Sequence, residues 1–130
     1  MVKTSKVIIK FESVGSVEAV IDYSENPKTA EAVLSNLPLE GRVETWGEEI
    51  YFEVPLRLEP ENSRVKVSRG EIAYWPEGNC ICIFFGKTPI SPSAEDIRAY
   101  SPVNVFGRIT GNLDLLRKVK SGNRVIIDKV

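Results

Sequence analysis

The most informative absence in this chain is histidine, of which the 130 residues contain none. Histidine is the commonest general base and a frequent metal ligand, so its absence excludes every Ser-His or Cys-His dyad and most zinc-enzyme sites. Glutamine is absent as well. With many lysines, glutamates, valines and isoleucines, this favours a heat-adapted source, because side-chain amides are thermolabile.

Neither charge nor hydrophobicity is concentrated along the chain. The 17 basic and 18 acidic residues give a net charge of −1, so no overall field favours nucleic acid or a membrane surface. No apolar run is as long as a transmembrane helix, and the N-terminus MVKTSKVIIKF lacks the apolar core of a signal peptide. We expect a cytoplasmic protein without nucleic-acid or membrane partners, forming a single domain over residues 1–130. The oligomeric state stays open.

Alternation of apolar and polar residues is the dominant pattern, and it indicates β-strands. Residues 6–23 are typical of a hairpin that turns near Gly15, and residues 49–54 of a further strand. Glycines punctuate the rest of the chain and separate shorter predicted strands. These lie at 42–46, 65–68, 71–76, 80–85, 103–109 and 124–128.

Two predicted helices interrupt the strands. The first, over 26–37, has Asn26 as its expected N-cap and Pro27 at the first helical position. The second, over 112–121, has Asn112 as its expected N-cap. Many short strands with two separated helices predict a mainly β fold, either a closed or nearly closed antiparallel barrel or, alternatively, a split sandwich.

The strand predicted at 80–85, CICIFF, is apolar on both faces. Cys80, Cys82 and Phe84 share one face, so a strand of this kind must be covered on both sides. Two cysteines cannot supply the four ligands of a structural zinc site, and residues i and i+2 of one strand have poor disulfide geometry. We interpret both cysteines as buried core residues and expect neither a metal site nor a cofactor.

Two segments resemble parts of cyclophilins. VFGRITGNLDLLRKV, residues 105–119, is similar to the cyclophilin strand V-F-G-[KR]-V and the Gly-Met-Asp-Val-Val helix that follows it, and NPKTAEAVLSNL, residues 26–37, to the helix that starts Ala-Pro-Lys-Thr. The motifs WGEEIYF (46–52), GEIAYWP (70–76) and FFGKTP (84–89) resemble a family of short prokaryotic cyclophilin-like proteins without assigned function. This resemblance implies a closed antiparallel β-barrel of about eight strands with two α-helices.

The catalytic residues of cyclophilins match this chain poorly. Cyclophilins use an arginine on a Phe-His-Arg-Val strand, and the corresponding residues 40–43 are EGRV, so only Arg42 and Val43 match. The cyclophilin glutamine has no counterpart. The pocket histidine falls near Val103, and the pocket tryptophan near Arg98. The resemblance therefore leaves Arg42 as a catalytic residue only if the protein is an isomerase.

Polar aromatic side chains and carboxylates gather in the motifs that carry the resemblance, and on the rim of a barrel they bind small ligands or extended peptides. The opposite interpretation places these aromatic residues in the core and the glutamates in solvent. Thr88 lies in the loop after the 80–85 strand, where hydroxyls either bind ligands or satisfy turn backbone groups. The candidate ligand-binding residues are Arg42, Trp46, Glu48, Tyr51, Tyr74 and Thr88.

Three functions remain open after this reasoning. We favour a non-catalytic module that binds a small molecule or an extended peptide. The first alternative is a weak or divergent peptidyl-prolyl cis-trans isomerase that uses Arg42. The second is a protein-interaction or assembly subunit, because exposed sheet edges can pair with partners.

Overall fold

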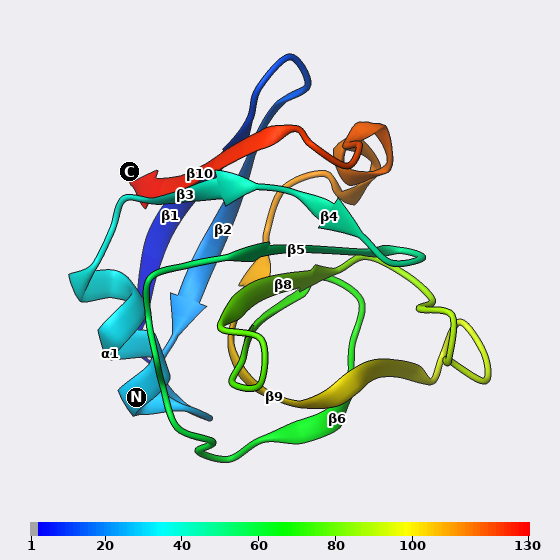
Figure 1. The fold of residues 1–130 in the computed structure, drawn as a ribbon. Coiled ribbons are helices and arrows are strands. Elements are labelled where there is room, and N and C mark those ends of the chain that lie inside the picture. The colour runs from blue at the N-terminus through cyan, green and yellow to red at the C-terminus, as the bar shows by residue number, and fades with distance from the viewer. Residues whose placement is uncertain (1–2) are drawn as a thin grey trace.

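The computed structural model describes residues 3–130, and one antiparallel sheet dominates it (Figure 1). The sheet runs in the order β3-β10-β1-β2-β9-β7-β8-β5-β4, and β6 pairs with β9 beside this path. One α-helix, α1, and one 3-10 helix, η1, lie between strands. The bounds are β1 Thr4–Phe11, β2 Gly15–Asp22, α1 Pro27–Ser35, β3 Leu39–Arg42, β4 Glu44–Thr45, β5 Glu49–Glu53, β6 Arg64–Val67, β7 Glu71–Trp75, β8 Cys80–Phe84, β9 Ile97–Ile109, η1 Leu113–Lys118 and β10 Arg124–Lys129.

Within residues 3–130 hydrogen bonds do not close this sheet, so the closed barrel expected from the sequence is not confirmed. The two ends of the strand order, β3 and β4, are neighbours along the chain and are separated by Val43. The backbone of Val43 bonds to the loop before β10, donating to Asn123 O (2.8 Å) and accepting from Gly122 N (2.7 Å). The strand predicted over 42–46 is divided at this point. Its first part pairs with β10 and its second part with β5.

The predicted hairpin is confirmed, and it builds one side of the larger hydrophobic core. β1 and β2 pair with Val7 opposite Ala19 and Ile9 opposite Val17, which puts the apolar side chains of both strands on one face. We call this cluster the inner core. It includes Val7, Ile9, Phe11, Val17, Ala19, Ile21, Ala30, Val33, Ile50, Phe52, Ile72, Tyr74, Ile81, Ile83, Phe85, Phe106, Leu116, Val125 and Ile127.

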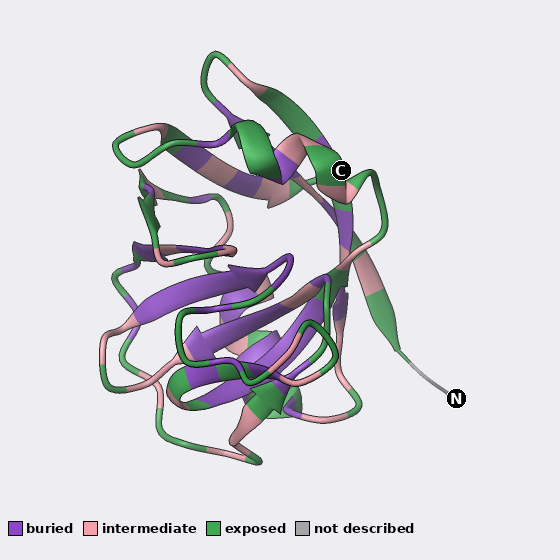
Figure 2. Cartoon of the chain, turned by 90° about the vertical axis from the view of Figure 1, so that its right-hand side faces the viewer, coloured by how far each residue is buried: buried purple, intermediate pink, exposed green. Residues whose placement is uncertain are grey.

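The strand β8 is buried along its whole length, as its two apolar faces predict. Ile81 and Ile83 join the inner core, whereas the other face joins a second cluster, which we call the outer core. This outer core is formed by β7 and β8 together with β6 and residues 97–105 of β9. Figure 2 shows buried residues concentrated in the strands and exposed residues in the connecting loops. The outer core consists of Val67, Ala73, Cys80, Cys82, Phe84, Ile97, Ala99, Val103 and Val105.

Two further elements differ from the sequence-based expectation. β9 begins at Ile97 rather than at 103, because residues 97–102 pack over the outer core although they resemble a polar loop. The segment expected as an α-helix over 112–121 is the six-residue 3-10 helix η1. It ends before Val119, whose extended backbone carries this side chain into the inner core.

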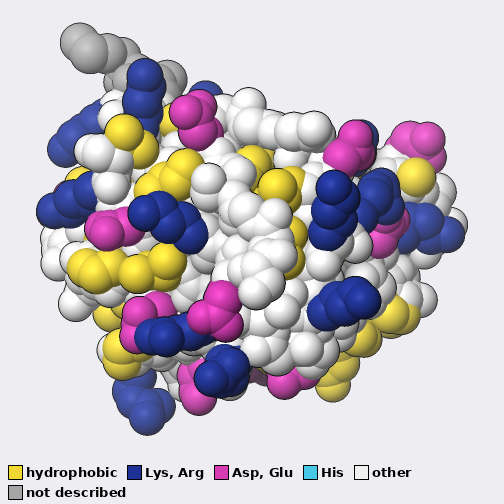
Figure 3. Space-filling model, turned by 90° about the horizontal axis from the view of Figure 1, so that it is seen from above, with side chains coloured by type: hydrophobic (Ala, Val, Ile, Leu, Met, Phe, Trp, Pro, Cys, Tyr) yellow, Lys and Arg dark blue, Asp and Glu magenta, His cyan; other side chains and the backbone are white. Residues whose placement is uncertain are grey.

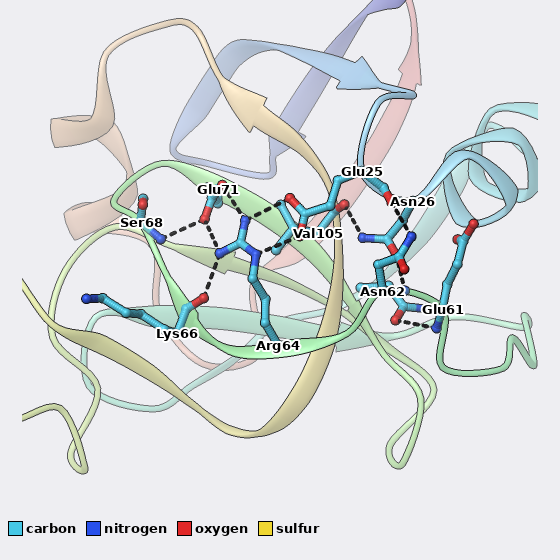
Figure 4. A network of polar contacts seen from close by, with 10 residues as sticks. Glu25, Asn26, Glu61, Asn62, Arg64, Lys66, Ser68, Glu71 and Val105 are labelled. Atoms are coloured by element: carbon cyan, nitrogen blue, oxygen red, sulfur yellow. Dashed lines mark hydrogen bonds and ion pairs between the residues drawn. The ribbon is translucent and has the colours of Figure 1, made fainter.

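A polar network fastens the chain between β5 and β6 to α1 and β9 (Figure 4). The Asn26 side chain donates to the Val105 carbonyl (2.8 Å) and accepts from Asn62 N (2.7 Å). Asn26 is the N-cap residue of α1, as predicted, but its side chain forms no cap hydrogen bond with the helix. Arg64 at the start of β6 lies between Glu25 (2.6 Å) and Glu71 (2.9 Å). These contacts hold β6 beside β9 on the outer side of the sheet.

The surface carries interspersed charges of both signs. Figure 3 shows Lys and Arg side chains next to Asp and Glu on the face seen from above, with small hydrophobic areas between them. Exposed pairs such as Arg124 with Glu40 (3.1 Å) occur on this kind of surface. In residues 3–130 no helix is both long and apolar enough to cross a membrane.

The two-sided burial of β8 predicts a large effect at Phe84, which is 0% exposed. Phe84→Ala is expected to lower the free energy of unfolding by about 3–5 kcal/mol, because it removes a ring from a closed core. Urea denaturation followed by circular dichroism measures this loss. The control is Ile90→Ala at a residue 50% exposed, where we expect a change below about 1 kcal/mol. Equal losses for the two variants contradict the outer core.

Candidate functional site

A cavity of about 160 Å³ opens beside the outer core, and we call it the outer pocket. A closed apolar cavity of roughly 150 Å³ holds benzene, so this space fits one small ring or one branched head group. Its walls come from the β4–β5 turn and from β5, β7, β8 and β9. The lining residues are Trp46, Glu49, Tyr51, Trp75, Cys82, Ala99, Tyr100, Ser101 and Val103.

Aromatic side chains form most of the entrance. Tyr100, which is 69% exposed, meets Trp46 and Trp75 edge-on, with ring centroids 5.9 and 6.0 Å apart. Trp75 Nε1 donates to Ser101 Oγ (2.6 Å), and the Ser101 hydroxyl donates to the carboxylate of Glu77. This chain of hydrogen bonds fixes the Trp75 indole, so the aromatic wall is formed before any ligand arrives.

The β4–β5 turn positions two pocket residues. Trp46 N donates to Glu49 O (3.0 Å), and Glu49 N donates back to Trp46 O (3.2 Å). Gly47 has φ of 62°, and a Cβ there would lie 2.8 Å from Lys87 O, so the turn requires glycine. Glu48 N donates to the same Lys87 carbonyl (2.8 Å). The sequence WGEE therefore sets where the indole and the second carboxylate point.

Glu49 is a buried carboxylate, 6% exposed, and it lines the outer pocket. Alternation along β5 places it on the same face as Tyr51, and Tyr51 pairs with Cys82 on β8. In residues 3–130 no lysine or arginine forms an ion pair with Glu49. Burial raises the pKa of Glu49 from 4.5 to about 7, and a hydrogen bond from the Cys82 thiol opposes that rise only in part.

The thiols are not activated for chemistry. Burial raises the pKa of Cys80 to about 11 and that of Cys82 well above its usual value. A nucleophilic cysteine needs a lowered pKa, so both thiols stay protonated at neutral pH. Over residues 3–130 no cluster of three or more potential ligands is placed to hold a metal ion. Cys82 instead contributes a small, polarisable wall to the pocket.

The outer pocket contains Trp46 and Tyr51, two of the six candidates named from the sequence. Arg42 lies elsewhere: it is exposed, and its Nη1 donates to Gly122 O (3.1 Å). Glu48 also lies outside the pocket, where its carboxylate pairs with Arg117 and accepts from Lys87 N. Both side chains therefore hold loops together in this structure.

The two remaining candidates are buried away from the pocket. Tyr74 is part of the inner core, and its hydroxyl donates to Leu56 O (2.7 Å). Thr88 is buried in the turn after β8, where its hydroxyl donates to Arg98 O (2.5 Å) and bonds to the Ser91 hydroxyl. For these two residues the geometry fits the interpretation as core and turn residues.

Seven of the nine residues that line the outer pocket were not among the sequence candidates, and Glu49, Trp75 and Tyr100 are three of them. The sequence could have predicted Glu49 as a pocket residue, because it lies two residues before Tyr51 on a strand and therefore shares its face. Trp75 lies opposite Cys80 in the β7–β8 pair, which puts it on the outer face. Tyr100 belongs to residues 97–102, which lie outside every strand predicted from the sequence, so its position depends on the tertiary fold.

Comparison with known proteins identifies related chains. The sequence profile described as cyclophilin-like matches residues 5–128. The solution structure of the hypothetical protein AF2241 from Archaeoglobus fulgidus is similar, with 38% identity and a TM-score of 0.79 over 97% of this chain and 95% of that chain. No curated protein matches the sequence.

A second similar structure is that of McbB in complex with tryptophan, with 17% identity and a TM-score of 0.71. The match covers 95% of this chain but 44% of the McbB chain, so the present chain spans less than half the length of McbB. At this identity the likeness shows a shared fold alone.

The raised pKa of Glu49 predicts how pH affects stability. The folded state holds the Glu49 proton more tightly than the unfolded chain, so the stability from this group is present below pH 4.5 and lost as pH rises through about 7. Glu49→Gln should therefore gain stability relative to the wild type by roughly 2–3 kcal/mol between pH 5 and pH 8.5. Urea denaturation at both pH values measures it.

The matched control for this measurement is Glu53→Gln, an exposed carboxylate on the same strand and the same face. It should leave the difference between pH 5 and pH 8.5 unchanged. Identical pH dependence in Glu49→Gln and the wild type contradicts the burial of an ionisable Glu49.

Proposed function

The chain belongs to the cyclophilin-like family, and we propose that it is a non-catalytic binding protein that holds a small organic molecule, or one side chain of an extended peptide, in the outer pocket. The observation that carries this proposal is the composition of the pocket. Aromatic walls surround a single buried carboxylate, and ligand sites typically combine apolar walls with a few placed polar groups.

The pocket is also preorganised. Hydrogen bonds to Ser101 and Glu77 hold the Trp75 indole, and the backbone pair between Trp46 and Glu49 holds the turn. A site of this kind loses little conformational freedom when it binds, which favours affinity even for a ligand of few atoms. The small side chain of Ala99 leaves the space that a ligand would occupy.

The geometry gives little support to prolyl isomerisation. Arg42, the single match to the catalytic arginine, is exposed and bonded to Gly122 O, and it does not line the outer pocket. Val103, near which the resemblance places the pocket histidine, does line the pocket but offers no polar atom in its side chain. One charge-assisted hydrogen bond is worth about 1.5–3 kcal/mol against a barrier of roughly 18–20 kcal/mol.

Ligand binding can be followed with high selectivity, because both tryptophans of the chain, Trp46 and Trp75, line the outer pocket. We expect indole, benzyl alcohol or benzylamine to shift both indole N–H resonances in NMR titrations. Ala99→Leu fills the pocket and should weaken this binding by about tenfold or more, since overpacking excludes the ligand. Trp75→Leu removes one wall and should also weaken it.

The control is Ala94→Leu at an exposed loop residue, which should bind as the wild type does. Thermal melts of each variant confirm that the fold is retained. If none of the three probes shifts either indole resonance, the proposed binding function is wrong.

Isomerase activity provides the second test. In a protease-coupled assay with proline peptides, we expect kcat/KM below about 10⁴ M⁻¹s⁻¹, roughly the lower edge of ordinary enzymes. Arg42→Ala should leave the measured rate unchanged, because the guanidinium does not reach the pocket. A higher rate that Arg42→Ala abolishes makes isomerisation the better assignment.

A further inference from the structure

Glu49 is the exception among the buried polar side chains. Over residues 3–130 the others are Asn26, Thr29, Thr88, Ser91 and Asn104, and each has hydrogen bonds to backbone or side-chain groups. The carboxylate of Glu49 has only the Cys82 thiol, a weak donor, beside it. An ionised carboxylate removed from water is costly unless a cation or strong donors reach it. Glu49 therefore lines the pocket with no cation from residues 3–130 paired with its carboxylate.

The aromatic rings of the outer pocket lack a protein cation as well. Elsewhere in the chain, Lys3 Nζ lies 4.6 Å from the Tyr23 ring centroid and Arg117 lies 5.8 Å from that of Phe85. Across residues 3–130 no lysine or arginine takes such a position over Trp46 or Trp75. Ring faces attract cations, most strongly where water is excluded. The pocket thus offers a carboxylate and aromatic rings that suit positive charge, and no lysine or arginine of residues 3–130 meets either of them.

From these contacts we infer that the outer pocket selects small organic monocations, namely ligands with a primary or methylated ammonium group, and that Glu49 supplies the opposite charge. This inference rests on the proposed binding function, because it assigns the ligand class of the same pocket. The ammonium group lies against the Trp46 and Trp75 rings. The rest of the ligand leaves through the opening beside Tyr100.

The groups that face Glu49 favour a cation or are neutral to it. Tyr51 on β5 and Cys82 on β8 carry no charge at neutral pH, since burial raises the pKa of both. Glu44 on β4 acts on Tyr51 as a further negative charge. On the β9 side the lining residues are Ala99, Tyr100, Ser101 and Val103, which include no cation. Nothing that lines the pocket repels an ammonium ion.

Proton and ligand compete for the same carboxylate. Because burial raises the pKa of Glu49 to about 7, the group is mostly protonated at pH 5.5 and mostly ionised at pH 8.5. A quaternary ammonium ligand keeps its charge at every pH, so any pH dependence of its binding reports on the protein. Its affinity should therefore rise with pH across this interval, whereas the affinity of a neutral ligand of the same shape should not rise.

The experiment compares choline with 3,3-dimethylbutan-1-ol, which has the same shape with carbon in place of the charged nitrogen. Binding to the full chain is followed by tryptophan fluorescence. At pH 8.5 we expect choline to bind about tenfold or more tightly than the alcohol. At pH 5.5, and in Glu49→Gln at either pH, this preference should fall to within about twofold. Glu53→Gln, the exposed carboxylate on the same strand face, should keep the wild-type preference.

The outcomes separate this inference from the proposed function. Equal binding of choline and the alcohol at pH 8.5 overturns cation selection while a binding pocket remains. A choline preference that survives in Glu49→Gln overturns the role of Glu49. If indole or benzyl alcohol binds but neither choline nor the alcohol does, the inferred ligand class is wrong. If no probe gives a binding signal, the proposed binding function itself is wrong.

Discussion

The burial of β8 on both faces is the constraint on which the rest of the structure depends. A strand that reads CICIF must be covered twice, and the inner core covers only one side. The second cover comes from β6 and from residues 97–105 of β9. The whole of β9 is 13 residues long, and it runs from this outer layer into the main sheet. The outer cover leaves a space beside β5, where small side chains meet the tryptophans. The outer pocket is that space.

A buried, unpaired carboxylate in this position weakens the fold at neutral pH. Replacing a buried ionised group by a neutral one of the same shape is often neutral or stabilising, so packing does not explain Glu49. Local rules are commonly broken where a protein has a function to perform, and the loss is offset elsewhere. Here the networks around Asn26 and Arg64 are well satisfied, and they stabilise the layer that forms one wall of the pocket. This carboxylate, which has no cationic partner in residues 3–130, is the feature on which the proposed binding of a cation rests.

The sequence predicts much of the fold because the alternation of apolar and polar residues along a strand depends only on neighbouring residues. Alternation at Val7 and Ile9 predicts the hairpin, and the two apolar faces of CICIF predict a strand that is covered on both sides. The prediction fails where a contact with a distant part of the chain determines the local structure. Asn26 is the N-cap of α1, but its side-chain amide bonds to Val105 and Asn62, far along the chain, rather than to the helix. Residues 97–102 resemble a loop, and only packing on the outer core makes them a strand. Three of the missed residues of the pocket wall, Ala99, Tyr100 and Ser101, lie there.

Membership of the cyclophilin-like family does not determine the chemistry of this pocket, since one fold can carry unrelated sites. The resemblance to cyclophilins implies a site built on a donating arginine, whereas Arg42 here points to the Gly122 carbonyl and stays in solvent. The charged group that reaches the pocket is the carboxylate of Glu49, which accepts hydrogen bonds when it is ionised. An ionised carboxylate cannot donate a hydrogen bond to a prolyl nitrogen. It instead attracts a ligand that itself brings the positive charge, as we propose for the outer pocket.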